Sequence, residues 1–253
     1  FVDLETTGLD PRQDEIIEIG MVPFIYRIDG TLLGTMPAFS RLREPSIPVP
    51  SLVQNLTGLT PERLAGQTVS ADDVAAFAPD ASLVIAHNAA FDRPFLERFC
   101  PTFVNRPWAC SMEDVPWDQA GFEGRKLGHL GLQAGFFFDG HRAVDDCQAA
   151  IALLGHTGFP ENRSALSLLL ERARTVWKRL WAEYAPFELK DTLKARGYRW
   201  NDGSDGRPKA WFIDRPPEKV EEEIRFLCSE IYQRKVDITV RSVEAGDRFT
   251  SRV

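Results

Sequence analysis

The spacing of hydrophobic residues changes along the chain. Within the first 160 residues, segments with strand-like spacing and segments with helix-like spacing both occur. Short β-rich runs, broken at Thr7-Gly8 and at the turn Asp29-Gly30, predict strands over 1–5, within 15–28 and over 31–42. A short apolar run predicts a strand at 83–86 that is buried on both faces. Helical spacing is expected at 53–56, 72–77, 91–99, 125–134 and 142–154. Strands followed by alternating strands and helices predict an α/β sandwich with a mixed sheet.

The pattern changes after residue 160. Residues 165–184 carry an apolar stripe at helical spacing, ending where Ala185-Pro186 breaks it. We therefore expect a connecting amphipathic helix within 161–185 and a domain boundary at Pro186. The remaining residues, 186–253, predict a small α+β domain. Its expected elements are a helix over 189–195, paired strands at 198–200 and 209–213, a helix opened by Pro216-Pro217 and a strand at 238–243.

Charge is distributed unevenly along the 253 residues, whose net charge is −7. Residues 1–160 hold eleven Lys and Arg against 21 Asp and Glu, a balance of −10. Residues 161–185 balance at +2, from five basic and three acidic residues, and residues 186–253 at +1, from 14 and 13. The acidic excess therefore lies in the first region, which does not resemble an ordinary nucleic-acid-binding surface.

The four cysteines stand far apart and form no C-x-x-C pair, which argues against a disulfide framework or a thiolate zinc site. This use of cysteine favours a reduced, cytoplasmic setting. The chain has no apolar run near the roughly 20 residues of a membrane span, and its start lacks a signal-peptide pattern. Since Phe1 stands in what reads as mid-strand, we expect residues upstream of it, which leaves a cleaved leader open.

Three acidic segments contain the candidate chemistry. Asp3 and Glu5 are two residues apart on a strand, so both carboxylates project from one face while Val2 and Leu4 enter the core. Two such acids repel each other unless a cation lies between them, and hard oxygen ligands suit Mg²⁺ or Mn²⁺. A solvated acidic edge is the alternative explanation of this pair.

The second segment, His87 to Asp92, follows the buried strand, and the third runs from Asp139 to Asp146. An acid near a helix start also complements the helix dipole, so Asp92 alone does not indicate a metal site. His141 follows a glycine at a loop-to-helix junction, where an imidazole can act as a general base. Helical geometry alone does not decide whether Asp145 or Asp146 is its acidic partner.

Together, the three segments match three motifs in order and spacing. They are D-x-E-T-T-G at 3–8, H-N-x-x-F-D at 87–92 and H-x-A-x-x-D at 141–146. Over residues 1–155 the chain resembles the DEDDh family of 3′–5′ exonucleases. This is the DnaQ-like class that includes the proofreading epsilon subunit of bacterial DNA polymerase III. The resemblance selects Asp146 over Asp145 as the fourth acid.

The resemblance implies a ribonuclease H-like mixed five-stranded sheet flanked by helices, in addition to the small α+β domain. It also implies that hydrolysis of the terminal phosphodiester depends on two Mg²⁺ or Mn²⁺ ions. The implied metal ligands are Asp3, Glu5, Asp92 and Asp146. The implied catalytic residues are His141, which would take a proton from the attacking water, and Glu5, which with Asp146 would help to hold the ion that binds this water. The implied substrate-binding residues are Thr6, Thr7, Leu9, Asn88 and Phe91, although Leu9 would equally suit a core position.

The expected substrate is the 3′ end of single-stranded or frayed DNA, with release of nucleoside 5′-monophosphates. An exoribonuclease is the nearest alternative, because the motifs do not reveal whether the site accepts a 2′-hydroxyl. A non-catalytic nucleic-acid-binding or replisome module is a second alternative, and the motifs specify no polymerase partner. Basic and aromatic residues alternate at 198–200 and 209–212, a pattern typical of either single-strand binding or a small domain's core.

Overall fold

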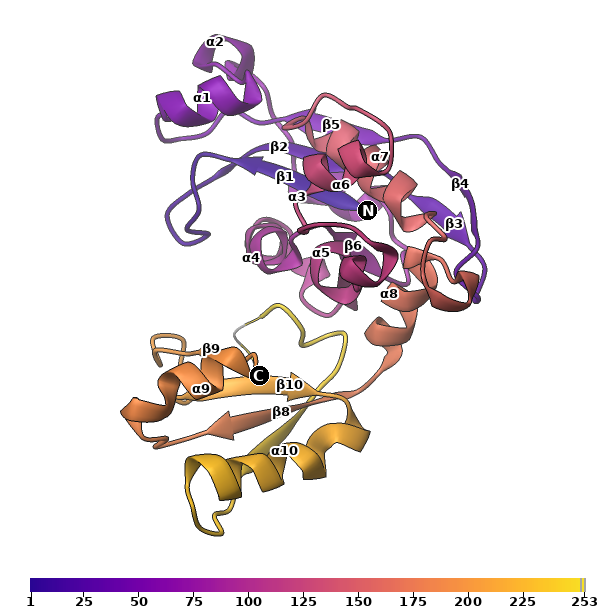
Figure 1. Cartoon of the computed structure of the whole chain (residues 1–253). Helices are drawn as coiled ribbons and strands as arrows, with labels where there is room; N and C mark the ends of the chain where they lie inside the picture. Colours follow the sequence, from indigo (N-terminus) through magenta and orange to yellow (C-terminus); the bar gives the residue numbers. More distant parts are fainter. Residues whose placement is uncertain (251, 253) are drawn as a thin grey trace. The chain divides into compact units, whose positions relative to one another are not determined.

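The computed structural model describes residues 1–250 and 252 and divides the chain into two compact units (Figure 1). The units are Phe1–Ala173 and Arg174–Val253. The boundary expected at Pro186 is therefore wrong, and residues 161–185 are not a connecting segment. Among the described residues, no helix has both the length and the apolar character needed to cross a membrane.

The first unit contains seven strands. They are β1 Val2–Thr6, β2 Ile16–Met21, β3 Phe24–Tyr26, β4 Leu32–Thr35, β5 Phe39–Leu42, β6 Val84–Ala86 and β7 Trp108–Cys110. Three of them form an antiparallel sheet in the order β1-β2-β5, and β6 pairs with β7 in parallel. Because β6 also lies beside β1, the five strands follow the order β5-β2-β1-β6-β7. This mixed arrangement agrees with the expected five-stranded sheet.

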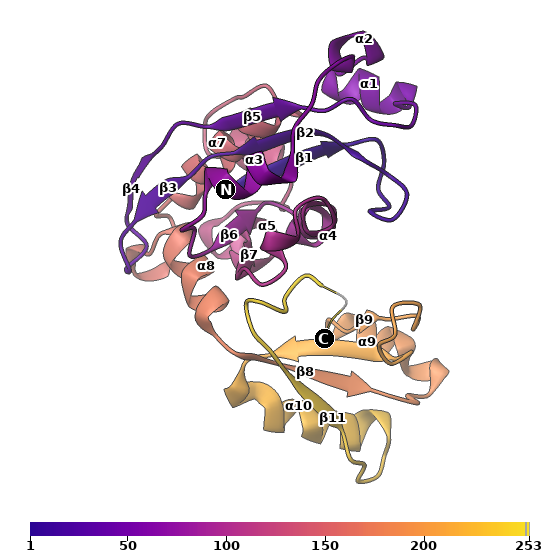
Figure 2. The same cartoon turned by 180° about the vertical axis from the view of Figure 1, so that it is seen from behind.

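The hairpin around Asp29-Gly30 is present, but its return segment is two strands rather than one. Strand β4 ends at Thr35 and β5 begins at Phe39, with Pro37 between them. Proline lacks the N–H that a continuous strand would use, so the chain leaves β3 and joins β2 instead. The β3–β4 hairpin lies at one end of the sheet, and the segment that follows β5 lies at the other (Figure 2).

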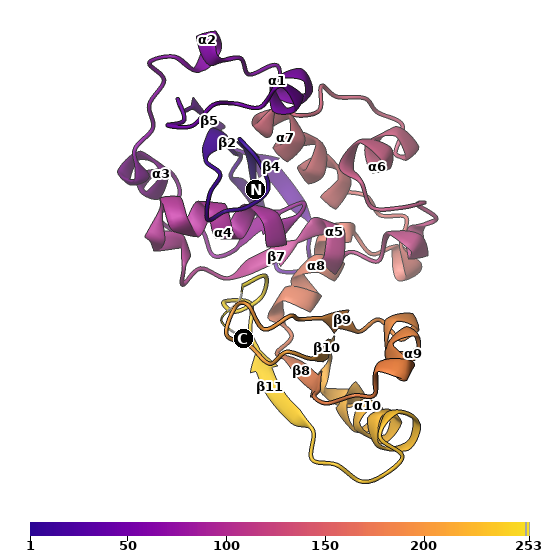
Figure 3. The same ribbon diagram turned by 90° about the vertical axis from the view of Figure 1, so that its left-hand side faces the viewer.

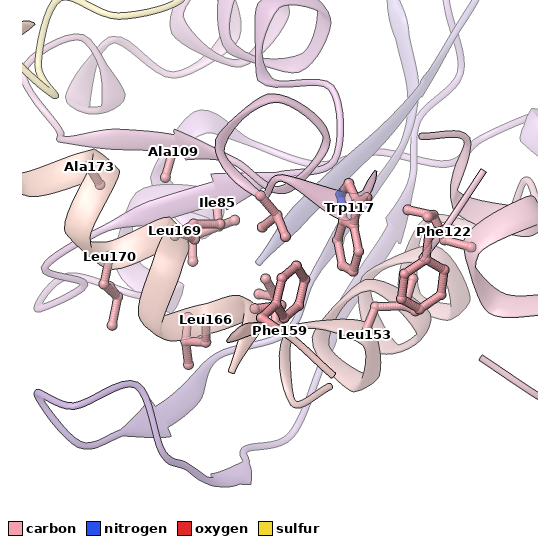
Figure 4. Packing of buried hydrophobic residues seen from close by; sticks show 14 residues of the cluster. Ile85, Ala109, Trp117, Phe122, Leu153, Phe159, Leu166, Leu169, Leu170 and Ala173 are labelled. Carbon is pink, nitrogen blue, oxygen red and sulfur yellow. The ribbon is translucent and has the colours of Figure 1, made fainter. Parts of the chain in front are cut away.

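Eight α-helices are assigned in the described part of this unit. They are α1 Ser51–Thr57, α2 Pro61–Leu64, α3 Ala71–Phe77, α4 Ala89–Phe99, α5 Ser111–Asp114, α6 Leu127–Gln133, α7 Ala143–Leu154 and α8 Ala165–Arg174. Helices α6 and α7 pack side by side, and α7 also packs on β1 and β2 (Figure 3). The apolar side of α8 packs through Leu166 and Leu169 into a core that includes Ile85, Trp117 and Phe159 (Figure 4).

Only the first half of the helix expected over 165–184 is confirmed. Helix α8 ends at Arg174, and Trp177–Ala182 is strand β8. The apolar residues of this stretch fit a helical stripe, but Thr175, Val176 and Trp177 are strand formers. Tertiary pairing decides the outcome, because β8 has a partner strand along each of its two edges.

The second unit is built on a four-stranded antiparallel sheet in the order β11-β8-β10-β9. Its other strands are β9 Arg199–Trp200, β10 Trp211–Arg215 and β11 Thr239–Val243, and its α-helices are α9 Lys190–Ala195 and α10 Val220–Phe226. A separate core, which includes Leu180, Leu193 and Ile213, joins helices and sheet. The α+β character expected of the C-terminal region is confirmed, with β8 added to it.

Gly20 lets α7 approach the sheet closely. A Cβ atom at this position would lie 2.4 Å from the carbonyl carbon of Ala143 and 2.7 Å from its Cβ. Real atoms cannot approach so closely, so any larger residue would push α7 away from β2. Gly20 pairs with Asp3 across β1 and β2, and Ala143 begins the helix that carries Asp146.

We expect Gly20→Ala to reduce the free energy of unfolding by about 2 kcal/mol, because the added methyl group forces strand and helix apart. Urea denaturation measures the loss. Gly34→Ala on β4 is the matched control, since nothing lies within 4 Å of its added Cβ. Equal stability losses in the two variants would show that the close contact of β2 and α7 is not a packing constraint.

A candidate active site on strand β1 and helix α7

Successive side chains of strand β1 point alternately into the core and to the opposite face. Val2 and Leu4 are buried, whereas Asp3 and Glu5 are partly exposed on the opposite face. The expected projection of the two carboxylates from one face is confirmed. Their neighbours across β2 are Gly20 and Glu18, which share that face because paired residues in an antiparallel sheet point the same way.

Helix α7 brings a third carboxylate to this face. One ligand oxygen from each of Asp3, Glu5 and Asp146 lies within 4.8 Å of the others. The backbone N–H of Arg142 donates to the Asp146 carboxylate at 3.1 Å and fixes it at the helix start. The adjacent Asp145 instead lines a separate cavity of about 360 Å³. The structure therefore groups Asp146, not Asp145, with the acids of β1.

Asp92 completes the acidic group from the first turn of α4. Its side chain is buried, and its Oδ1 accepts a hydrogen bond from the backbone N–H of Leu4 at 3.1 Å. The antiparallel register directs this N–H away from β2, toward the side of β1 on which β6 lies. The hydrogen bond thus ties the start of α4 directly to the strand that carries Asp3 and Glu5.

Burial and mutual repulsion raise the pKa values of all four acids. The pKa of Asp3 lies well above its ordinary value because of burial, with the charges of Asp92, Asp146 and Glu5 adding to the shift. Burial also raises the pKa of Glu5 to about 8, that of Asp92 to about 8 and that of Asp146 to about 6. A further positive charge close to these acids would favour their ionised forms and lower the pKa values again.

A fifth acid, Glu18, belongs to this region and was not predicted from the sequence. It is buried in β2, and Arg142 holds it through two hydrogen bonds of 3.1 and 3.3 Å. The N–H of Ala143, at the start of α7, lies 3.5 Å from the same carboxylate. The sequence did contain a signal, because Glu18 stands inside the apolar run Ile16-Ile17-Glu18-Ile19. A charge buried in such a strand needs a partner, so this position predicts a buried ion pair.

His141 lies directly before this ion pair. Its backbone is left-handed, with φ of 65°, and its side chain is exposed. Such a conformation is uncommon for a residue other than glycine and is concentrated at functional sites. The charge of His141 and hydrogen bonds from the backbone of His141 and Arg142 oppose the burial that raises the pKa of Asp146. The histidine therefore lies beside the acidic group, at the edge that solvent reaches.

The end of β1 and the loop after it contain residues expected to meet substrate, in two different environments. Thr6 and Thr7 are buried, with Thr6 Oγ1 donating to the carbonyl of Gly8 at 2.6 Å and Thr7 Oγ1 to Asp14 at 3.1 Å. Their side chains shape the loop. Leu9 is 83% exposed, which rules out the core position considered from the sequence.

The segment before α4 is similarly divided. Asn88 is exposed at the helix start, and Phe91 is half-buried with its ring 5.1 Å from that of Phe95. His87 is buried and uses both ring nitrogens, one with Ser111 Oγ at 2.9 Å and one with the carbonyl of Arg125 at 2.8 Å. Both ring nitrogens of His87 are therefore engaged in local hydrogen bonds.

The donor set fits hard divalent cations. It consists of carboxylate oxygens on one face, without sulfur ligands, and each carboxylate has a raised pKa. Mg²⁺ and Mn²⁺ prefer such oxygen ligands, and their positive charge would remove the repulsion among the acids. Asp3, Glu5 and Asp146 are the residues that could hold such an ion, with Asp92 beside them.

A family model described as Exonuclease matches residues 1–154, which contain the whole acidic group. The chain belongs to the exonuclease family. Its membership confirms the resemblance read from the three motifs, and it also agrees with the ribonuclease H-like sheet expected for this family.

Two bacterial relatives of this exonuclease chain are DNA polymerase III proteins. A DNA polymerase III subunit epsilon of Treponema pallidum is 31% identical over 160 residues, which cover 60% of this chain and 72% of that protein. A PolC-type DNA polymerase III of Clostridium perfringens is 31% identical over 158 residues. That match covers 60% of this chain but only 10% of the polymerase, so most of its length has no counterpart here.

A solved structure of Escherichia coli Exonuclease I in complex with an oligonucleotide is similar in fold. The TM-score is 0.52 at 14% sequence identity, and the match covers 85% of this chain and 62% of that one. At this identity the comparison supports the exonuclease fold and no residue-level role.

The raised pKa values lead to a pH dependence of stability. The carboxyls have pKa values near 4 when unfolded, and folding raises that of Glu5 and that of Asp92 to about 8. Between these pH values the folded protein holds protons that the unfolded chain has released, so the free energy of unfolding falls as pH rises. In EDTA we expect the Tm to fall from pH 5 to pH 8, by about 2 to 4 °C for each kcal/mol lost.

Differential scanning calorimetry with and without Mg²⁺ measures this effect. Mg²⁺ at pH 8 should raise the Tm again, and Asp3→Asn, which removes one charge, should reduce the dependence on both pH and metal. A Tm in EDTA that stays constant or rises across this range would contradict the described electrostatics.

The Glu18–Arg142 pair yields a second prediction. Arg142→Ala leaves a buried carboxylate without its partner and should reduce the free energy of unfolding by about 2 kcal/mol. Arg12→Ala is the control, because Arg12 is exposed where it pairs with Asp10 and should change stability by less than about 1 kcal/mol. Chemical denaturation at pH 7 measures both, and equal effects would refute a structural role for the buried pair.

Proposed function

We propose that the first unit is a metal-dependent 3′–5′ exonuclease that removes nucleoside 5′-monophosphates from single-stranded or frayed DNA. The observation that supports this most strongly is the group of Asp3, Glu5 and Asp146 oxygens within 4.8 Å on one face of β1 and α7. Family membership adds the reaction class, because the match covers the segments that carry these residues. The substrate is the anionic 3′ end of a nucleic-acid strand.

In this proposal Asp3, Glu5, Asp92 and Asp146 hold two Mg²⁺ or Mn²⁺ ions. When bound, such ions make water more acidic and neutralise charge that develops on a phosphate. The protein contributes the placement of its acids: β1 supplies two, and the hydrogen bond from Leu4 fixes Asp92 beside them. The carboxylates lose protons as the ions bind, so the raised pKa values couple metal binding to proton release.

His141 is the proposed general base. Its imidazole accepts a proton from the attacking water, and Glu5 would help to hold the ion beside that water. The exposed position of His141 allows its ring to approach a bound strand, while the Arg142–Glu18 pair fixes the backbone next to it. Histidine suits this task because its ordinary pKa is near neutral.

The loop after β1 and the start of α4 are the proposed binding surface for the terminal nucleotides. The exposed Leu9 offers an apolar contact to a base, and exposed Asn88 and half-buried Phe91 face the substrate from α4. Since Thr6 and Thr7 use their hydroxyl groups within the loop, their proposed contribution is through the backbone.

The test is digestion of DNA and RNA oligomers labelled at the 3′ or 5′ end, with Mg²⁺, Mn²⁺ or EDTA. We expect DNA to be shortened from the 3′ end with either metal and to stay intact in EDTA. Asp3→Ala should abolish digestion, and His141→Ala should reduce the rate by about 10² to 10⁴. Each variant's fold is checked by circular dichroism.

Asp145→Ala is the matched control, because it removes an acid next to Asp146 that lies outside the group. It should digest DNA at the wild-type rate. Preferential digestion of RNA would replace the DNA substrate by an RNA one. No digestion of either polymer by the folded wild-type protein, or full activity in Asp3→Ala, would contradict the proposal.

A further inference from the structure

The second unit displays aromatic and basic side chains on both faces of its sheet. Alternation along β10 separates them, since Trp211 and Ile213 face the helices and Phe212 and Asp214 face the other way. On each face aromatic rings lie beside cations. On only one face are the rings and the cations both accessible to solvent. That difference distinguishes a structural cluster from a binding surface.

The face that carries Phe212 is a structural cluster. Phe212 is buried, and Arg179 and Arg199 lie 4.7 and 4.8 Å from its ring centre. Both arginines also form ion pairs with Asp214, at 2.7 and 3.1 Å. Since the ring is covered and the charges are neutralised locally, this face has neither a free stacking surface nor unpaired positive charge to offer.

The opposite face presents accessible rings. Trp200 and Trp211 are directly paired across β9 and β10, and their rings meet edge to face with centroids 5.4 Å apart. Trp200 is 49% exposed, although it is one of the largest apolar side chains of a small unit. Trp211 is partly buried against the core, which anchors the pair at the edge of the sheet.

Two lysines of α9 extend this surface. Lys194 Nζ lies 6.0 Å from the ring centre of Trp211, and Lys190 Nζ lies 4.2 Å from that of Phe187, which is 73% exposed. Lys190 and Lys194 are four residues apart on one helix and therefore share a face. Three rings and two cations, here named the aromatic–lysine track, are thus linked by these contacts: Phe187, Lys190, Lys194, Trp211 and Trp200.

The charges around the track favour an anion. Asp191 approaches Lys194 only to 3.9 Å in an exposed position, so it does little to offset the lysine. The unit from Arg174 to Val253 holds 17 basic and 14 acidic residues, a balance of +3, whereas residues 1–173 hold 13 and 23, a balance of −10. Positive charge is thus concentrated in the unit that lacks the acidic group.

We propose that the aromatic–lysine track binds single-stranded DNA, with bases stacked on Trp200 and Phe187 and phosphates near Lys190 and Lys194. Stacking requires unpaired bases, because the rings of a duplex are already stacked on one another. The identity of the ligand rests on the proposed function, since the strand would be the one whose 3′ end the first unit hydrolyses. Because the two units share one chain, this contact raises the effective concentration of that end.

The test measures binding of a 5′-fluorescein-labelled dT20 oligomer to the full chain by fluorescence anisotropy in EDTA. Chelation prevents cleavage and leaves the acidic group without cations, so it contributes no attraction. We expect Trp200→Ala and Lys194→Glu each to weaken binding by about tenfold, and Trp200→Phe to restore most of the loss because it keeps a ring. Lys194→Glu should also make binding less dependent on salt.

Lys235→Ala is the control, since it removes an exposed lysine of the same unit outside the track and should bind within about twofold of wild type. Using two track variants separates a binding defect from misfolding, which the Tm of each also reports. Track variants that bind dT20 as tightly as Lys235→Ala would overturn the proposal. The same EDTA assay succeeds or fails independently of whether the first unit digests DNA.

Discussion

Electrostatic repulsion among closely grouped acids is the constraint around which the first unit is organised. Asp3, Glu5 and Asp146 converge on one face of β1 with Asp92 beside them, and burial raises the pKa of each. Specific contacts in the surrounding structure hold the acids in place despite this repulsion. Gly20 admits α7, the N–H of Leu4 holds Asp92, and Arg142 neutralises the further charge of Glu18. The energetic cost of bringing the acids together makes divalent cations the natural complement of this fold.

Much of this site could be predicted because its signals are local in sequence. The alternation of Asp3 and Glu5 follows from strand geometry, and the three motifs stand at the starts or ends of elements that the hydrophobic pattern also predicts. The choice of Asp146 over Asp145 came from family resemblance, and its physical basis is three-dimensional: only Asp146 is grouped with the acids of β1. Glu18 was missed because its role depends on Arg142, 124 residues away.

The second unit was harder to predict because its interactions are long-range. The stretch from Trp177 to Ala182 fits a helical stripe as well as a strand, and only its pairing with β10 and β11 decides between them. The aromatic residues were equally ambiguous in sequence. Tyr198 and Phe212 are buried, whereas Trp200 stays half exposed at the sheet edge. The core explanation therefore applies to Tyr198 and Phe212, whereas the exposure of Trp200 leaves it accessible for the proposed binding role.

The central claim is that the acids of β1, α4 and α7 form a divalent-cation site. The most direct measurement is anomalous diffraction from crystals of the protein grown with Mn²⁺. The account predicts Mn²⁺ peaks bound by carboxylate oxygens of Asp3, Glu5 and Asp146, with Asp92 at the same centre. It also predicts that these peaks disappear in Asp3→Ala crystals. Occupied Mn²⁺ sites elsewhere with none at these carboxylates, in crystals of the active protein, would contradict it.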